Sequence, residues 1–293
     1  MPSDPTRRRR AAASLAALSV LAALATVLAF AVAVHTATGR RLDDAARGDV
    51  SLSAAPRAFA ATQRLLETIS VSSLALFGIG IMGIALLRRR PWLAVGAGVV
   101  VLGANITTQL MKTNFSRPDP AGWDGTTPGA FPSGHVTVAM SLGMSLVLVA
   151  PPALRWTATL VGCAYATGVG VAVIALDWHR PSEVVGAYLV SVAWTAAVGA
   201  ILTGTGEGGP GEGDRGPGGT RLGALAAAVL GLSFAVVVGT ALAQRVDLVR
   251  VADDRTAFAV ASLVVAATCI ALGAMVAALL QRAQIPPPGA ADR

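Results

Sequence analysis

Long apolar runs, separated by short polar segments, dominate the chain. A helix that spans the hydrocarbon core of a bilayer needs about 20 predominantly apolar residues. Several runs come close to this length, which predicts an all-α fold, a polytopic membrane helical bundle of about eight spanning helices. The runs lie near residues 11–34, 69–87, 91–111, 135–151, 156–176, 182–203, 221–243 and 256–281.

A Gly-rich stretch divides these runs into two groups. Residues 204–220 contain too few apolar side chains to form a core and are typical of a flexible linker. The linker separates a six-helix core, 11–203, from a C-terminal transmembrane pair, 221–281. A basic N-terminus, 1–10, and a short tail, 282–293, flank these helices.

Composition and charge support a membrane protein. Hydrophobic residues make up 54% of the chain and charged residues only 13%, whereas roughly a quarter of the residues are charged in soluble domains. The net charge of +7 comes from arginine clusters between apolar runs, such as Arg7–Arg10 and Arg88–Arg90. Such clusters set membrane topology, so we expect no nucleic-acid partner.

The arginine clusters predict which polar segments face the cytoplasm. Arg7–Arg10 place the N-terminus there, and alternating crossings bring the linker and the C-terminus to the same side of the plasma membrane. The first apolar run is longer than the roughly 7–15 residues of a signal-peptide core, so we expect an uncleaved helix. Three loops then lie on the outer face, at 35–68, 112–134 and 177–181.

Cysteine and lysine are rare. Cys163 and Cys269 both lie inside apolar runs, which predicts two small buried hydrophobic residues and no disulfide framework. Lys112 is the single lysine of the chain, although arginine is abundant. This bias indicates a GC-rich coding sequence, hence a bacterial source, and makes Lys112 a candidate functional residue. Snorkelling at the membrane surface is the simpler account of Lys112 and of nearby Arg117.

The second outer loop ends in a motif that suits a phosphate group. Pro132-Ser133-Gly134-His135 precedes an apolar run, and with Ser133 as the expected N-cap, free backbone N–H groups point outward. Such a helix N-terminus favours anions, and glycine lets the backbone approach a phosphate closely. A plain helix cap followed by an interfacial histidine would give the same pattern.

The third outer loop contains His179 and Arg180, and Glu183 follows in the first turn of the next helix. The Glu183 carboxylate can accept a hydrogen bond from one ring nitrogen of His179. This bond would fix the tautomer and leave the other nitrogen free as a nucleophile. Alternatively, Glu183 only complements the helix dipole.

Taken in order, these segments resemble the type 2 phosphatidic acid phosphatase (PAP2) family, which also includes vanadium haloperoxidases. The family shows a Lys with an Arg-Pro motif, then Pro-Ser-Gly-His, then a Ser-Arg…His…Asp motif. The resemblance covers roughly residues 60–205. The residues that carry it are Lys112, Arg117-Pro118, Pro132-Ser133-Gly134-His135, His179 and Glu183.

The motifs differ from the common family pattern in several places. The lysine and the Arg-Pro pair are closer together than usual, and Asp119 stands where a second arginine is common. Ala172-Val173 replaces the Ser-Arg pair, and Glu183 replaces the Asp. Two cationic phosphate ligands are therefore missing, and Arg180 is the candidate that could compensate.

The resemblance implies phosphoryl transfer without a metal or another cofactor. His179 would attack phosphorus in line to give a phosphohistidine, while Glu183 orients its ring. His135 would protonate the leaving oxygen and then activate water. The extra methylene of glutamate moves the carboxylate by about a bond length, and an error near 1 Å can cost roughly a hundredfold in rate. We therefore expect either a shifted helix start or a slow enzyme.

Cations and backbone amides would hold the equatorial phosphate oxygens, because positioning and charge stabilisation supply most of this catalysis. The residues implied for this role are Lys112, Arg117, Ser133, Gly134 and Arg180.

An outer-face site among spanning helices suits a phosphate carried on a lipid, with its tail between helices. Candidates are phosphatidate, a phosphatidylglycerol phosphate, and a polyprenyl phosphate or diphosphate.

The alternative is a catalytically silent PAP2-like protein that binds a lipid head group. His135, His179 and Glu183 could also form a metal site. A transporter is disfavoured because no charged residue lies in mid-helix. The sequence predicts no oligomeric state.

Overall fold

The computed structural model describes residues 5–46, 56–67, 69–115, 117–118, 126–127, 129–206 and 254–283. These residues are almost entirely helical, and two short strands form an antiparallel pair. The elements are α1 (Pro5–His35), α2 (Ala37–Ala45), α3 (Pro56–Glu67), α4 (Val71–Leu87), α5 (Pro91–Asn114), β1 (Arg117–Pro118), β2 (Thr126–Thr127), α6 (Gly134–Val149), the 3-10 helix η2 (Pro152–Leu154), α7 (Arg155–Ala175), α8 (Pro181–Thr205) and α10 (Asp254–Arg282).

The predicted multi-pass helical bundle is confirmed. Five of the described helices are long and apolar enough to cross a membrane, and α4 and α6 are apolar but shorter. All seven coincide with predicted apolar runs. The remaining predicted run, 221–243, lies outside the described residues, as does the linker from residue 207 onward. The five long spans are Arg8–His35, Pro91–Asn114, Pro152–Ala175, Pro181–Thr205 and Thr256–Arg282.

The polar segment at 35–68, which we expected to be a loop, contains two helices, α2 and α3. Charged and apolar residues are mixed in both, so a search for long apolar runs does not reveal them. At the start of α2, the Thr36 hydroxyl accepts a hydrogen bond from the Gly39 N–H at 2.9 Å. This N-cap bond lets a new helix begin directly after α1 ends.

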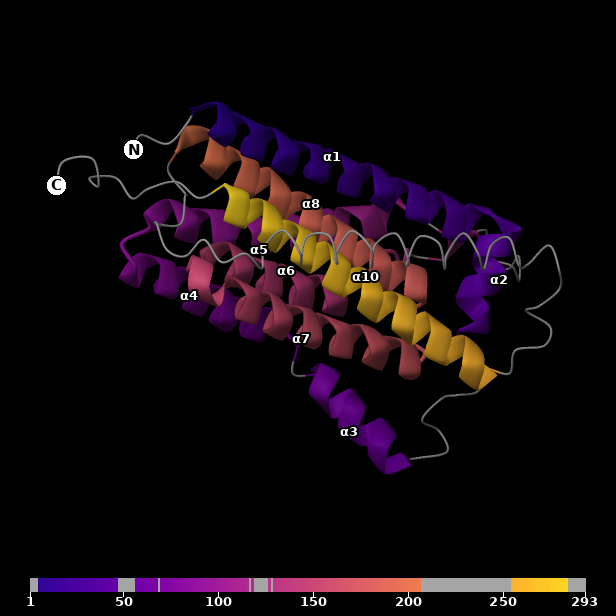
Figure 1. Cartoon of the computed structure of the whole chain (residues 1–293). Helices are drawn as coiled ribbons and strands as arrows, with labels where there is room; N and C mark the ends of the chain where they lie inside the picture. The colour runs from indigo at the N-terminus through magenta and orange to yellow at the C-terminus, as the bar shows by residue number, and fades with distance from the viewer. Residues whose placement is uncertain are drawn as a thin grey trace.

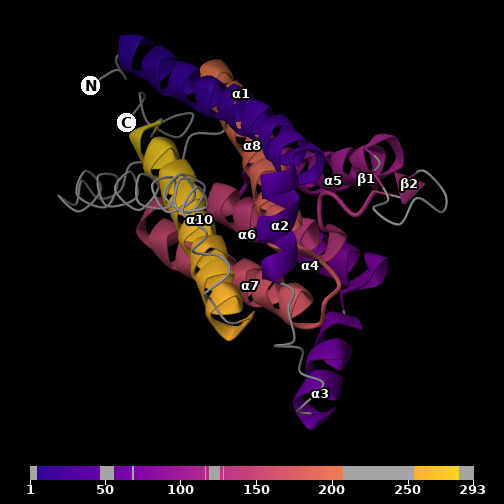
Figure 2. The same ribbon diagram turned by 90° about the vertical axis from the view of Figure 1, so that its right-hand side faces the viewer.

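The helix α6 lies at the centre of the described bundle, and most of its side chains are buried. It contacts α4, α5, α7, α8 and α10. The long helix α1 packs along α8 at the edge of the bundle, and α10 lies next to α8 and α7 (Figures 1 and 2). The predicted burial of Cys163 and Cys269 is confirmed, because both are free thiols at the contact between α7 and α10.

Contacts at one end of the bundle join the segments that we expected on the cytoplasmic side. There the Arg88 guanidinium donates to the Val149 carbonyl, and the Gln281 side chain donates to the Pro152 carbonyl at 2.9 Å. The opposite end contains α2, the end of α5 and the beginnings of α6 and α8 (Figure 1). The two motif-bearing loops therefore meet at one end of the bundle.

Candidate active site

Backbone and hydroxyl contacts bring three helix ends together. The Ser133 N–H donates to the Glu183 carbonyl at 3.0 Å, which joins the start of α6 to the start of α8. The buried Phe131 ring packs against α8 at Gly186. The hydroxyl oxygens of Thr108 and Thr137 lie 2.9 Å apart and connect α5 to α6.

The central contact of the site is a hydrogen bond between His179 and Glu183. The Nδ1 atom of His179 lies 2.8 Å from Oε2 of Glu183, whose side chain is only 1% exposed. The same oxygen accepts the Arg180 backbone N–H at 3.1 Å. The longer glutamate, in the first turn of α8, therefore reaches back to an imidazole that precedes the helix, with ordinary hydrogen-bond geometry.

The turn between α7 and α8 sets the position of His179. Asp177 adopts a positive φ of 60°, a conformation that aspartate tolerates better than most residues. The N–H groups of Trp178 and His179 both donate to the Val173 carbonyl, at 3.0 and 3.1 Å. The Trp178 ring then lies 5.5 Å from the His135 ring, centroid to centroid.

Lys112 and His135 lie at the same end of the bundle as this pair. Lys112 interacts electrostatically with Glu183, and His135 interacts with both Lys112 and His179. The ammonium Nζ of Lys112 is 3.2 Å from the position that a Cβ on Gly134 would occupy. The absence of a side chain at Gly134 therefore leaves room for the ammonium beside the N-terminus of α6.

Ser133 occupies the expected N-cap position of α6, but its hydroxyl forms no cap hydrogen bond. The side chain is fully buried, and its Oγ has no hydrogen-bond partner among the described residues. A buried polar atom without a partner is costly, so each such atom needs an explanation, such as a catalytic role or a bound water or ion. The predicted N-cap position of Ser133 is therefore confirmed, but the side-chain hydrogen bond that a serine usually makes there is not formed.

Two arginines were predicted to contact phosphate. The Nε of Arg180 donates to Asp44 at 2.8 Å, and its NH1 lies 3.8 Å from Oε1 of Glu183. Arg180 is thus adjacent to the His179 pair and shared between two carboxylates. The backbone of Arg117 forms β1, but its side chain lies outside the described residues.

Sequence reasoning missed the contribution of α2. The carboxylate of Asp43 accepts hydrogen bonds from the backbone and side chain of Ser182, and Asp44 pairs with Arg180. Adjacent acidic residues in a polar segment gave no signal that distinguished them from a solvated surface. Only the turn from α1 into α2 brings them to α8.

A groove of about 640 Å³ leads from the candidate site along the outside of α4, α5 and α6. Lys112, Gly134 and His135 line it together with apolar residues that include Leu74 and Ile106. Polar side chains, among them Asn105 and Gln109, also line the groove, so it combines a charged group with polar and apolar surface.

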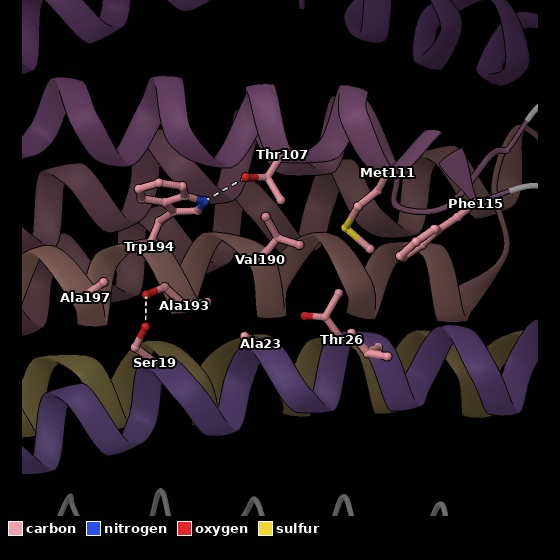
Figure 3. A pocket seen from close by; sticks show the side chains of 11 residues that line it. Ser19, Ala23, Thr26, Thr107, Met111, Phe115, Val190, Ala193, Trp194 and Ala197 are labelled. Carbon is pink, nitrogen blue, oxygen red and sulfur yellow. Dashed lines mark hydrogen bonds between the residues drawn. The ribbon is translucent and has the colours of Figure 1, made fainter. Parts of the chain in front are cut away.

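A second cavity of about 410 Å³ lies between α1, α5 and α8 (Figure 3). Two hydrogen bonds cross its walls: the Trp194 indole donates to the Thr107 hydroxyl at 3.0 Å, and the Ser19 hydroxyl donates to the Ala193 carbonyl at 2.8 Å. None of the predicted site residues lines this cavity.

The described residues contain no group of three or more His, Cys, Asp and Glu side chains arranged to hold a metal ion. His135, His179 and Glu183, the trio considered from the sequence, are thus not grouped as ligands. The residues that do converge are a histidine–carboxylate pair, a second histidine and a lysine.

Comparison with known proteins supports the resemblance. Residues 93–204 match the PAP2 superfamily. The chain carries a PAP2-superfamily segment. Its fold is similar to a crystal structure of a transmembrane PAP2-type phosphatidylglycerolphosphate phosphatase from Bacillus subtilis, with a TM-score of 0.51 and 19% sequence identity. The match covers 62% of this chain and 94% of that chain. No curated protein matches this chain.

The contact between Lys112 and Gly134 generates a first prediction. A methyl group in Gly134→Ala would force the Lys112 ammonium to move by a few tenths of an ångström. We expect kcat/KM for phosphate release from a lipid phosphate to fall about threefold to tenfold, since rates are sensitive to such displacements. Gly168→Ala is the control, because a Cβ at Gly168 meets no atom within 4 Å. Equal activity of the two variants would contradict a role for this contact.

Proposed function

We propose that this protein is a membrane lipid phosphate phosphatase, which hydrolyses a phosphate ester or diphosphate of a lipid through a phosphohistidine intermediate. The observation that carries the proposal is the 2.8 Å hydrogen bond from His179 to the buried Glu183 carboxylate. Because this bond occupies Nδ1, the ring presents Nε2 to a substrate. The PAP2-superfamily match over residues 93–204 supports a phosphatase at the level of the family.

In the first step, Nε2 of His179 attacks phosphorus and the bond from phosphorus to the lipid oxygen breaks. His135 donates a proton to that leaving oxygen, which releases the dephosphorylated lipid. The developing positive charge on the His179 ring is stabilised by the Glu183 carboxylate.

In the second step, His135 takes a proton from a water molecule, and the water oxygen attacks the phosphohistidine. The bond between phosphorus and nitrogen breaks, so inorganic phosphate leaves and His179 is restored. Both steps concentrate negative charge on the equatorial phosphate oxygens. Lys112, Arg117 and Arg180 would supply positive charge there.

The N-terminus of α6 would supply hydrogen bonds to the same oxygens. The backbone N–H of Gly134 lies in the first turn, where helical N–H groups lack carbonyl partners within the helix. The buried Ser133 hydroxyl, which has no partner among the described residues, can donate one more hydrogen bond. The Ser133 N–H already donates to the Glu183 carbonyl. The phosphate contact predicted for this residue is therefore assigned to its hydroxyl.

The groove beside α4, α5 and α6 supports a lipid as the substrate. Lys112 and His135 line it, and so do the apolar side chains of Leu74 and Ile106. A phosphate beside Lys112 and His135 would place an acyl or prenyl chain against these apolar side chains. Candidates remain phosphatidate, a phosphatidylglycerol phosphate, and a polyprenyl phosphate or diphosphate. The arginine cluster Arg88–Arg90 lies at the other end of the bundle, which favours a site on the outer face of the plasma membrane.

A second candidate function is that of a catalytically silent protein that binds a lipid head group. The observation that favours it is at Ala172-Val173, where the PAP2 pattern has Ser-Arg. Val173 is fully buried among apolar side chains of α7 and supplies no cation. A silent relative would use the same groove and phosphate contacts without forming a covalent intermediate.

The leading proposal predicts metal-independent phosphate release that depends on His179. Purified protein in detergent would be assayed with a panel of the candidate lipid phosphates in the presence of EDTA. We expect release by the native protein and a fall of at least roughly a thousandfold in His179→Ala, since the nucleophile is lost. Release that requires added metal, or that persists in His179→Ala, would exclude the phosphohistidine route. Lipid binding without any release would favour the silent relative.

The groove generates a separate prediction about the lipid chain. Ile106→Trp places a larger side chain in the groove, and Val27→Trp does the same in the second cavity. Ile106 is 56% exposed and Val27 is 54% exposed, so the two substitutions are matched in the burial of the residue that they replace. We expect Ile106→Trp to raise KM for a long-chain lipid phosphate about tenfold or more, since obstruction of an apolar pocket costs binding on this scale.

The same variants would be assayed with a short, water-soluble phosphate ester. Ile106→Trp should change its hydrolysis by less than about twofold, because that substrate needs no chain groove. A larger effect of Val27→Trp on the long-chain substrate would instead place the lipid chain in the second cavity.

A further inference from the structure

The helix α2 reaches across to the first turn of α8, although 139 residues separate the contacting side chains. Asp43 is 5% exposed, and its Oδ1 accepts the Ser182 backbone N–H at 3.0 Å. Its Oδ2 accepts the Ser182 hydroxyl at 2.5 Å. Both oxygens of one buried carboxylate therefore hold a single residue of α8.

This contact provides a helix cap from a distant part of the chain. The first N–H groups of a helix have no carbonyl partners within the helix, and a side chain at the N-cap position usually accepts one of them. In α8 that position is Arg180, whose side chain makes no cap hydrogen bond. Asp43 takes over this function, and its negative charge complements the positive end of the helix dipole.

We propose that Asp43 is a positioning residue for the His179–Glu183 pair. Ser182 is the immediate neighbour of Glu183, so fixing the Ser182 backbone fixes the point from which the Glu183 side chain extends. Helix ends fray when they are not capped. Without the contact from α2, the first turn of α8 would move and the His179 ring would lose its fixed orientation. This inference rests on the proposed phosphatase function for its catalytic consequence.

The sharp turn between α1 and α2 makes the contact possible. The Thr36 hydroxyl donates to the Val32 carbonyl at 2.6 Å and accepts from the Gly39 N–H at 2.9 Å. A Cβ on Gly39 would lie 2.1 Å from the Val32 carbonyl oxygen, so no larger residue fits this approach. The turn directs α2 over the end of the bundle (Figure 2).

The neighbouring residue, Asp44, makes a contact of a different kind. Its ion pair with Arg180 is 2.8 Å long, but the Asp44 side chain is 54% exposed. Exposed ion pairs contribute little because water and salt screen them. Asp44 is therefore a matched control on the same helix: the same residue type, next in sequence, near the same helix end.

The test compares three variants of the full-length protein in detergent. Asp43→Ala removes both hydrogen bonds to Ser182. Asp43→Asn can keep them, because its amide oxygen accepts from the Ser182 N–H while its NH₂ group donates to the Ser182 hydroxyl. Asp44→Ala removes only the exposed ion pair. Hydrogen–deuterium exchange of a peptide that covers the start of α8, and kcat and KM with a lipid phosphate, would be measured for each variant.

We expect faster exchange at the start of α8 in Asp43→Ala and a fall of about tenfold or more in kcat, with KM changed by less than about threefold. Asp43→Asn should restore exchange and kcat to within about threefold of the native values, and Asp44→Ala should stay within the same range. Gly39→Ala should reproduce Asp43→Ala, since it displaces α2.

Other results would overturn the proposal. Unchanged exchange in Asp43→Ala would exclude the cap, and faster exchange with unchanged kcat would exclude its catalytic consequence. An equal effect of Asp44→Ala would show that Asp43 has no special role. Exchange is independent of activity, so it decides the cap even if the native protein releases no phosphate. In that case the proposed function fails, and the positioning role fails with it.

Discussion

The site depends on one buried hydrogen bond, between Nδ1 of His179 and the Glu183 carboxylate. A carboxylate that is removed from water needs polar partners, and Glu183 finds them in the imidazole and in the Arg180 backbone N–H. The fixed ring, the lysine of α5 and the start of α6 then converge at one end of the bundle. Asp43 of α2 also fixes the start of α8 through Ser182, although α2 precedes the segment that matches the PAP2 superfamily.

The surrounding helices connect this polar end to the membrane. A phosphate needs cations and N–H donors, whereas a lipid chain needs an apolar surface, and the groove beside α4, α5 and α6 offers both along its length. Because α6 is enclosed by other helices, packing fixes the position of its N-terminus, where the phosphate contacts are proposed. The proposed substrate class follows from this combination of a charged group and an apolar surface in one groove.

Much of this arrangement could be predicted from the sequence. Apolar runs give the membrane helices because their length is set by the bilayer. His179 and Glu183 could be paired because they lie close together in sequence, one just before α8 and one in its first turn. The helices α2 and α3 could not be predicted in this way, since their apolar and charged residues are mixed. Asp43 was missed because its partner is distant in sequence, and no local spacing encodes that contact.

His179 is proposed to carry phosphate between the two steps, and trapping the phosphohistidine tests this role most directly. The native protein would be mixed with a lipid phosphate, quenched in base to preserve phosphohistidine, and digested for mass spectrometry. We expect one added phosphate on His179, and none on the corresponding peptide when His179→Ala is treated identically. Phosphate release without any modified histidine, or with phosphate on another residue, would contradict it.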